Sequence, residues 1–369
     1  MTTTQLADGD RRLPSLTGLR FFAAFAVFGF HVSVVELFAD PHGAPGVLNY
    51  LFRQGATGVS FFFVLSGFVL CWSARPGDTI RRFWRRRAAK VYPNHFVTAL
   101  FALLLAVAAG AVSFWAVSAN LLLLQAWVPD EKVYYGLNTP SWSLSCEALF
   151  YLCFPFLLAA IDRLPRRGLW PATVATFAAV CVMPLVALAL PDDLHYWFVY
   201  VFPPVRMLEF VAGILLARIV QNGLWIRWGV LPASLLAVAA YVVSGYLPLG
   251  FSYVAGTVIP LALLIPAVAA SDLRGGGRSI LRTRTAIWLG EVSFAFYLVH
   301  QLAIRVADRA LGGRELSDPA GMAVALGMLA LAMVGSWALY RIVEKPAMAR
   351  FAGRRAPARP VAPQPAQAT

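Results

Sequence analysis

Residues 18–32 read GLRFFAAFAVFGFHV, in which ten uncharged residues separate an arginine from a histidine. The surrounding segment, 15–37, is long and apolar enough to cross a lipid bilayer, which takes about 20 such residues. Ionisable residues are costly inside a bilayer, and those retained there commonly have a function. Arg20 and His31 lie about three helical turns apart, on nearly the same face and about 16 Å apart along the axis. We therefore expect Arg20 near the cytoplasmic surface and His31 toward the opposite one.

The rest of the chain has the same apolar character. Of its 369 residues, 59% are hydrophobic and only 13% are charged, whereas about a quarter of the residues in soluble domains are charged. The sequence predicts an all-α polytopic membrane protein with about ten transmembrane helices. The predicted spans are 15–37, 55–74, 91–112, 142–161, 170–190, 204–220, 229–246, 253–270, 286–307 and 321–343. A shorter apolar stretch, 114–128, predicts an interfacial or re-entrant helix.

The basic residues indicate how the chain is oriented in the membrane. The net charge is +13, but the charge lies between apolar segments and not on one face of a soluble domain, which argues against nucleic acid as a partner. Most of the 31 lysines and arginines fall in alternate loops and the two ends of the chain, so the positive-inside rule places both termini in the cytoplasm. We expect a cytoplasmic segment 1–14, a membrane domain 15–343 and a disordered basic, proline-rich tail 344–369.

The fourth predicted span contributes a carboxylate. It begins SWSLSCEALFYLCFP (141–155), where spacings of four place Ser143, Glu147 and Tyr151 on one helix face. Counted from the outer surface, Glu147 lies about 9 Å deep, similar to His31. A carboxylate at this depth can orient the imidazole and stabilise its protonated form. We interpret His31 and Glu147 as catalytic, with His31 as a general base acting on a hydroxyl; a structural buried pair is the alternative.

The ninth predicted span carries a polar stripe. In EVSFAFYLVHQ (291–301), Ser293, Tyr297 and His300 share one side of a helix. Tyr297 or Ser143 is a candidate donor to an oxyanion that develops during group transfer. His300, in the outer half of the span, is a further candidate on the acceptor side of the site.

Other polar or small residues in the spans favour structural roles. Ser66 and Gly67 indicate close helix packing, and Arg206 and Glu209, three residues apart, are expected to pair with each other. No His or Cys cluster has metal-ligand spacing, so we predict no metal site. Four cysteines are interpreted as small buried hydrophobic residues: Cys71, Cys146, Cys153 and Cys181.

A dense basic segment precedes the third predicted span. Residues 81–93, RRFWRRRAAKVYP, contain six basic residues. They can serve as a topology signal that also attracts anionic lipid, or as a clamp for phosphate, which guanidinium groups bind in a bidentate manner. We favour a clamp for a polyanionic donor with a slender reactive arm that reaches His31, the shape of an acyl-CoA thioester. The clamp would consist of Arg20, Arg86, Arg87 and Lys90.

Five stretches together resemble the acyltransferase-3 family of bacterial membrane O-acyltransferases. They occur in the family's order and extend from residue 16 to residue 300. Each is weak evidence alone, but five in order make a specific match. The stretches are LTGLRFFAAFAVFGFH (16–31), GVSFFFVLSGFVL (58–70), RRAAKVYP (86–93), PSWSLSCEALFYLCFP (140–155) and SFAFYLVH (293–300).

The resemblance implies about ten membrane helices and transfer of an acyl group, often acetyl, from acyl-CoA to a carbohydrate hydroxyl, with no bound cofactor. It implies that His31 is the catalytic histidine, Arg20 its paired arginine and Glu147 the acidic residue of the fourth-span motif. The family's cytoplasmic Arg-x-x-Arg pattern falls on Arg87 and Lys90, where lysine departs from the usual arginine and lacks its bidentate fork.

The resemblance leaves several points open. Arg82 and Arg85 also fit the Arg-x-x-Arg spacing. Some members carry a fused extracytoplasmic esterase-like domain that is not seen here, so we expect the chain to act alone or to hand acyl groups to a separate partner transferase. We expect a bacterial plasma-membrane protein, and its composition is similar to that of enzymes that acylate macrolide sugars in antibiotic biosynthesis. The acyl group can pass directly from the donor to the acceptor hydroxyl, or it can first form a covalent intermediate on His31.

Two other functions fit parts of the pattern. A transporter or flippase of glycolipids would use Arg20 and the basic segment to attract anionic headgroups, without acyl transfer. A membrane-bound acyltransferase of a different fold would also use an intramembrane histidine, but its other motifs are not seen. Release of free CoA that depends on an acceptor would distinguish the enzymes from the transporter.

Overall fold

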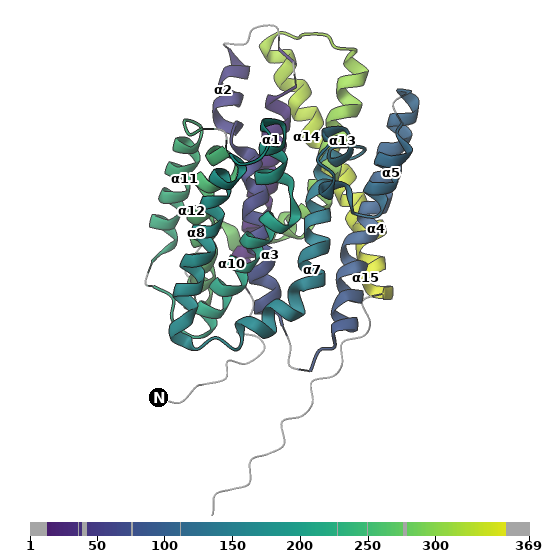
Figure 1. Ribbon diagram of the computed structural model, residues 1–369. Helices are drawn as coiled ribbons and strands as arrows, with labels where there is room; N and C mark the ends of the chain where they lie inside the picture. Colours follow the sequence, from purple (N-terminus) through teal and green to yellow (C-terminus); the bar gives the residue numbers. More distant parts are fainter. Residues whose placement is uncertain are drawn as a thin grey trace, which may run out of the picture.

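The computed structural model describes residues 13–35, 37–38, 43–74, 77–110, 112–226, 228–248, 250–275 and 279–351, and this part is a helical bundle without strands (Figure 1). The helices are α1 (Pro14–Ser33), α2 (Ala44–Phe52), α3 (Gly58–Trp72), α4 (Ile80–Ala108), α5 (Phe114–Leu121), α6 (Glu131–Tyr134), α7 (Trp142–Ile161), α8 (Leu169–Ala187), α9 (Asp192–Tyr196), α10 (Pro203–Gln221), α11 (Val230–Ser244), α12 (Gly256–Leu273), α13 (Arg284–Leu311), α14 (Asp318–Leu339) and α15 (Lys345–Phe351). Short 3₁₀ turns are η1 (Gly55–Thr57), η2 (Gln125–Trp127), η3 (Thr139–Ser141), η4 (Arg166–Gly168) and η7 (Ile280–Arg282). Single π-helical turns are η5 (Trp197–Val201), η6 (Phe251–Ala255) and η8 (Tyr340–Glu344).

The predicted fold class is confirmed. Within the described residues, 9 helical segments are long and apolar enough to cross a membrane. The span predicted at 229–246 is α11, an apolar helix of only 15 residues. The short helix predicted within 114–128 is α5, and η2 follows it.

The predicted start of the third span is wrong. We expected the basic residues 81–90 in a loop before a helix that starts at 91, but α4 begins at Ile80 and includes them. Thr79 caps the helix, because its hydroxyl accepts a hydrogen bond from the Arg82 amide. The basic segment is therefore a rigid helical surface that continues into an apolar helix.

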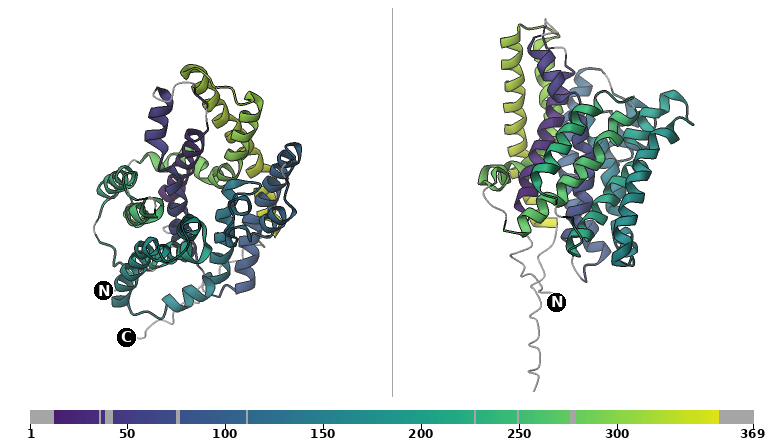
Figure 2. Two further views of the ribbon diagram at one scale, coloured as in Figure 1. Left: turned by 45° about the horizontal axis from the view of Figure 1, so that its top comes forward. Right: turned by 90° about the vertical axis from the view of Figure 1, so that its left-hand side faces the viewer.

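Helices α3 and α10 pack closely against each other inside the bundle, which Figure 2 shows from two further sides. A Cβ atom on Gly67 would lie 2.0 Å from the Phe210 carbonyl oxygen, and one on Gly213 would lie 2.0 Å from that of Val64. Only glycine permits this approach of two backbones. The predicted packing role of Gly67 is confirmed.

The predicted pair in α10 is also present. The Arg206 guanidinium lies 3.2 Å from the Glu209 carboxylate, and both side chains are buried. Arg206 also donates to the Ser60 hydroxyl of α3. Its guanidinium lies over the rings of Phe63 and Tyr200. This pair therefore stabilises the contact between α3 and α10.

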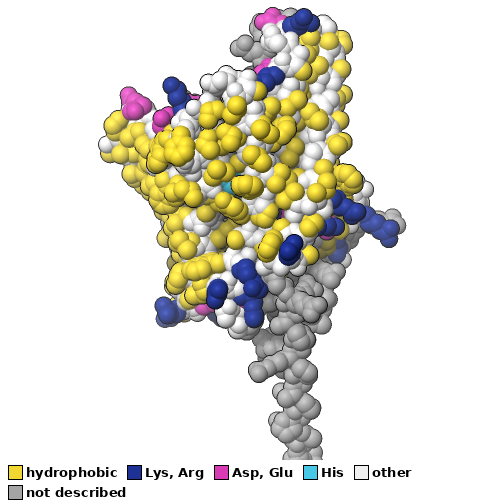
Figure 3. All heavy atoms as spheres, turned by 90° about the vertical axis from the view of Figure 1, so that its right-hand side faces the viewer, with side chains coloured by type: hydrophobic (Ala, Val, Ile, Leu, Met, Phe, Trp, Pro, Cys, Tyr) yellow, Lys and Arg dark blue, Asp and Glu magenta, His cyan; other side chains and the backbone are white. Residues whose placement is uncertain are grey.

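Ionic contacts join the segments that the sequence places in the cytoplasm. The Asp272 carboxylate accepts hydrogen bonds from Ser15 and lies 3.5 Å from Arg282, while Arg218 pairs with Asp162 at 2.6 Å. The start of α1 and α15 lie at the same end of the bundle (Figure 1). On the face shown in Figure 3, basic side chains gather toward that end, below a broad hydrophobic surface. Which side of the membrane this end faces stays a prediction.

The tail begins later than expected. We predicted disorder from residue 344, but residues 345–351 form α15, and Glu344 ends the π turn before it. Lys90 and Asn94 of α4 both donate to the Glu344 carboxylate, which attaches this segment to the bundle. The remaining predicted tail, 352–369, and residues 1–12 lie outside the described residues.

Candidate functional site

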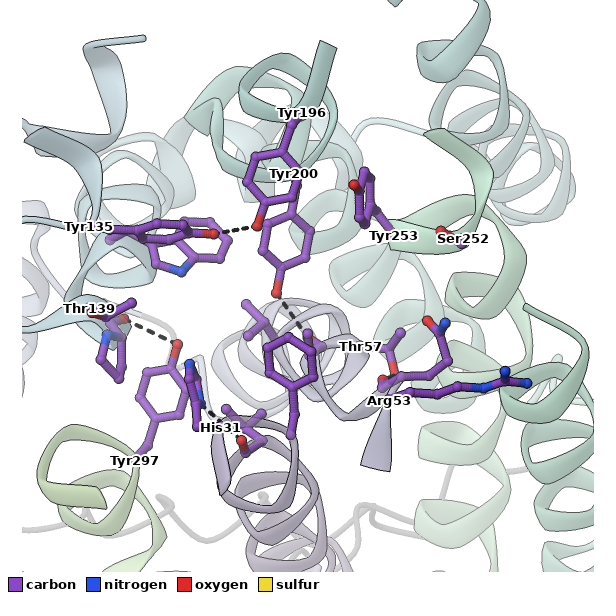
Figure 4. A pocket seen from close by; sticks show the side chains of 17 residues that line it. His31, Arg53, Thr57, Tyr135, Thr139, Tyr196, Tyr200, Ser252, Tyr253 and Tyr297 are labelled. Carbon is purple, nitrogen blue, oxygen red and sulfur yellow. Dashed lines mark hydrogen bonds between the residues drawn. The ribbon is translucent and has the colours of Figure 1, made fainter. Parts of the chain in front are cut away.

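A cavity of about 430 Å³ opens beside the C-terminal end of α1. We call it the outer cavity, because the sequence predicts that this end of α1 faces outward. Its wall includes two charged or basic side chains, His31 and Arg53. Figure 4 shows His31 and Tyr297 on one side, the tyrosines of α9 and η5 opposite them, and the Arg53 guanidinium directed away from His31. The aromatic residues of the wall are Phe30, Tyr135, Trp142, Tyr196, Tyr200, Tyr253 and Tyr297.

His31 contacts a second histidine. Its Nδ1 lies 3.0 Å from the Val27 carbonyl oxygen, one turn earlier in α1, and 3.1 Å from Nε2 of His300 in α13. His300 is fully buried, and its Nδ1 lies 3.3 Å from the Phe296 carbonyl oxygen. The structure thus brings together the histidines of the first and ninth predicted spans.

The predicted pairing of His31 with Glu147 is wrong. The Glu147 carboxylate accepts a hydrogen bond of 2.5 Å from the Tyr151 hydroxyl, on its own helix. The predicted depth of His31 requires a first span that continues to residue 37, but α1 ends at Ser33. His31 therefore lies at the C-terminal end of its helix, whereas Glu147 lies more than one turn inside α7.

Glu147 lines a different cavity together with Arg20. This inner cavity, about 50 Å³, also includes Ser143, Ser293 and Tyr297 in its wall. Arg20 lies within electrostatic range of Glu147, and also of Glu344. We expected Glu147 beside His31 and Arg20 near the other surface, but the structure brings Arg20 and Glu147 to one cavity, and the lining given for that cavity does not include His31.

Tyr297 separates the two cavities, because its side chain lines both. Its hydroxyl donates toward the Pro140 carbonyl oxygen at 3.1 Å and Ser143 Oγ at 3.0 Å. Ser143 in turn donates to Pro140 at 2.9 Å. Both predicted oxyanion donors therefore already use their single hydroxyl proton within the protein.

The four predicted clamp residues lie within electrostatic range of one another, but they differ in their direct partners. Arg86 pairs with Asp78, and Lys90 pairs with Glu344 at 2.6 Å. The structure assigns no such direct ion pair to Arg20 or Arg87 within the described residues. Arg87 lies 5.8 Å from the centre of the Phe83 ring, and its Nε atom is buried without a hydrogen-bond partner. Arg20 and Arg87 are thus the cations of this set that are available to a ligand.

The helix also distinguishes the two Arg-x-x-Arg registers. Arg82 and Arg85 are exposed to solvent, whereas Arg87 and Lys90 are partly buried. Electrostatic contacts link Arg87 to Glu147 and Arg20. The geometry therefore favours the register of Arg87 and Lys90.

The tyrosines of the outer cavity were not predicted from the sequence. The hydroxyls of Tyr135 and Tyr196 are hydrogen-bonded to each other, and Tyr200 donates to the Ala56 carbonyl oxygen. Burial raises the pKa of Tyr135 well above its usual value, so this hydroxyl stays protonated. The aromatic density of KVYYG (132–136) and YWFVY (196–200) was a signal, but without a predicted contact between these segments it did not indicate a site.

The segment that carries Tyr135 is held by buried polar contacts. Arg305 donates to the Leu137 carbonyl oxygen and to Thr139 Oγ1. Asn138 donates to the Leu298 carbonyl oxygen at 2.9 Å. These bonds attach the loop before α7 to α13, the helix of His300, and so form a stable wall for the outer cavity.

Comparisons with known proteins find relatives over nearly the whole chain. A sequence model of the acyltransferase domain (acyltransferase-3) matches residues 13–341. The chain is 44% identical to Acyltransferase MdmB of Streptomyces mycarofaciens, over 97% of this chain and 96% of that protein. It is 29% identical to the Exopolysaccharide production protein ExoZ of Rhizobium meliloti (strain 1021), over 82% and 93%. It is 25% identical to the Putative peptidoglycan O-acetyltransferase YrhL of Bacillus subtilis (strain 168), over 91% and 55%. No solved structure matches the chain.

Proposed function

This chain belongs to the acyltransferase-3 family of membrane acyltransferases, and on that premise we propose that it moves an acyl group, acetyl or another short chain, from acyl-CoA to a hydroxyl of a carbohydrate-containing acceptor. The observation that carries the proposal is the position of His31. Its imidazole lines a cavity large enough for a small ligand. Among the described residues, Val59 and Tyr297 line both this cavity and the one that contains Arg20.

The reaction that we propose is direct transfer. Nε2 of His31 takes the proton of the acceptor hydroxyl, and the oxygen attacks the thioester carbonyl carbon. The carbon–sulfur bond breaks, and the leaving thiolate takes the proton from the imidazolium. The products are an ester and free CoA, and His31 returns to its neutral form.

The donor would bind from the end of the bundle where α4 begins. Arg20 lines the inner cavity and Arg87 lies within electrostatic range of Arg20 and Glu147, and guanidinium groups suit the phosphates of coenzyme A. Arg86 and Lys90, which we first placed in this clamp, are paired with Asp78 and Glu344. They would contribute more to the electrostatic field of the site than to direct contacts with the donor.

The acceptor would bind in the outer cavity. Tyrosine and tryptophan rings combine an apolar face with a polar group, which suits a sugar ring that exposes both C–H groups and hydroxyls. The described lining contains no carboxylate, which favours an acceptor without strong positive charge. Two relatives carry names that refer to exopolysaccharide and peptidoglycan. An envelope glycan or a glycosylated natural product, such as a macrolide sugar, fits this chemistry.

The test is the His31→Ala variant in purified protein. We expect it to lose acceptor-dependent release of free CoA while it still inserts and elutes as the folded protein, because Ala cannot take the hydroxyl proton. His195→Gln is the matched control, since His195 lies outside the cavity wall and contacts Leu190 and Asp192. Turnover near the wild-type level in His31→Ala would reject the proposal. Mass spectrometry of glycans and metabolites from a deletion strain would identify the acceptor by its lost acyl mass.

A further inference from the structure

Two histidines on different helices repeat the same local contact. His31 Nδ1 lies 3.0 Å from the carbonyl oxygen of Val27, and His300 Nδ1 lies 3.3 Å from that of Phe296, each four residues earlier. The third contact joins the rings, at 3.1 Å between His300 Nε2 and His31 Nδ1. These three distances restrict where the two ring protons can be.

A carbonyl oxygen only accepts hydrogen bonds, so each Nδ1 that faces one must carry a proton. In a neutral imidazole the other nitrogen is then unprotonated. With both rings in this tautomer, His300 Nε2 is an acceptor and His31 Nδ1–H is a donor, which agrees with the contact between the rings. All three contacts then pair a donor with an acceptor.

The opposite assignment fails at two contacts. If His300 Nε2 carried the proton and donated to His31 Nδ1, the lone pair of His31 Nδ1 would face the Val27 oxygen. His300 Nδ1 would likewise face the Phe296 oxygen without a proton. Two buried pairs of acceptors would then lie at hydrogen-bond distance, and unsatisfied buried polar groups are costly.

We propose that His300 is a positioning residue that, together with the Val27 carbonyl oxygen, holds His31 in the tautomer with a free Nε2 lone pair directed to the acceptor. This inference rests on the proposed function, in which that nitrogen takes the hydroxyl proton. When His31 becomes an imidazolium, its Nδ1–H bond to His300 becomes charge-assisted and therefore stronger in the transition state. His300 thus does through a neutral ring what a carboxylate does in other general-base pairs.

The surroundings of His300 fit this role. Its ring is fully buried and packs against Phe296 at 6.1 Å and Phe28 at 6.4 Å between ring centres. A buried ring with fixed neighbours holds its partner in one orientation. Glu147, which we first expected to orient His31, is hydrogen-bonded to Tyr151. Within the described residues no carboxylate forms an ion pair with His31 or His300.

The kinetic test compares two substitutions of His300. His300→Gln places an amide oxygen near the position of Nε2 and keeps an acceptor for His31, whereas His300→Leu fills a similar volume without one. We expect His300→Leu to lower kcat by about 10²–10⁴-fold with little change in either KM. We expect His300→Gln to restore most of kcat, while His195→Gln, the matched control, stays at the wild-type level. Equal losses in the Gln and Leu variants, or a wild-type kcat in His300→Leu, would overturn the proposal.

A spectroscopic test does not depend on activity. In protein labelled with ¹⁵N-histidine, the nitrogen shifts report the tautomer of each ring, and the His31 signal is the one that disappears in His31→Asn. We expect His31 in the wild-type protein to carry its proton on Nδ1. His95 provides an internal reference, because its Nε2 must donate to the Asn120 carbonyl oxygen, 2.9 Å away, and so has the opposite tautomer.

The outcomes separate this inference from the proposed function. A His31 proton on Nε2 in the wild-type protein would overturn the role of His300, even if His31→Ala is inactive. Because the Val27 carbonyl oxygen also faces His31 Nδ1, we expect the proton to stay on Nδ1 in His300→Leu while the His31 nitrogen shifts change through loss of the bond to His300; shifts identical to those of the wild type would overturn that role. Activity in His31→Ala would reject the proposed chemistry whatever the tautomer is.

Discussion

At the scale of single residues, the number of protons on a side chain limits what it can do. The Tyr297 hydroxyl has one proton, which it donates toward Pro140 and Ser143. The Tyr297 ring forms part of the wall between the outer and inner cavities. The structure therefore gives this residue two separable properties, a hydrogen bond and a position.

Tyr297→Phe tests which of these properties matters. Because the ring remains and the hydroxyl is already engaged, we expect kcat to stay within about tenfold of wild type, with stability lower by about 1 kcal/mol from the lost hydrogen bond. Acyl-transfer kinetics and thermal unfolding in detergent measure the two effects. A loss of about 10²–10³-fold, the usual effect of removing an oxyanion donor, would restore the role that the sequence suggested.

At the scale of an element, α4 shows how helical geometry sorts a run of like charges. The six basic residues of the segment 81–90 look equivalent in the sequence. In the helix, Arg85 is exposed, Lys90 contacts Glu344, and Arg87 lies against Phe83 and near Glu147. The difference between these positions comes from the 100° that separates consecutive residues.

Arg87→Gln therefore has a specific expected effect on the donor. The variant should raise the KM for acyl-CoA by about 10- to 100-fold, the range of one or two charge-assisted hydrogen bonds, and leave the KM for the acceptor unchanged. Arg85→Gln, on the exposed face of the same helix, is the matched control and should leave both values unchanged. The same shift in both variants would mean that the segment acts only through its total charge.

At the scale of the whole molecule, the two ends of the bundle differ in chemistry. The end with the start of α1 and α15 carries the contacts of Asp272, Arg218 and the basic turns of α4. The other end carries the outer cavity. A donor that binds at one end and an acceptor that binds at the other would meet where Tyr297 separates the cavities.

Thiol labelling in intact cells tests this orientation. An impermeant reagent should label Lys132→Cys, in the segment expected outside, and should label Arg163→Cys only after the cells are opened. Both positions are exposed. The native chain is the control for its own four free cysteines. The reverse pattern would place the termini outside and would overturn the assignment of the two ends.

Much of the architecture follows from local pattern. An apolar run long enough to span a bilayer must form a helix there, because its backbone groups have no water to bind. The separation of Arg20 and His31 follows from the rise of that one helix. The pairing of Arg206 with Glu209 and the close packing at Gly67 also follow from neighbours on one helix or from residue size, and all of these expectations agree with the structure.

The sequence by itself determined the helices, the intramembrane charges and the candidate histidine. Only the tertiary structure decided the partner of that histidine, because His300 is 269 residues away and reaches it through the packing of α13 on α1. It also directed Glu147 into the inner cavity and joined five tyrosines from separate segments into one wall. The physical reason is that periodicity defines a face along one helix, whereas the rotation and depth of two helices relative to each other depend on where each ends and on which side chains meet between them.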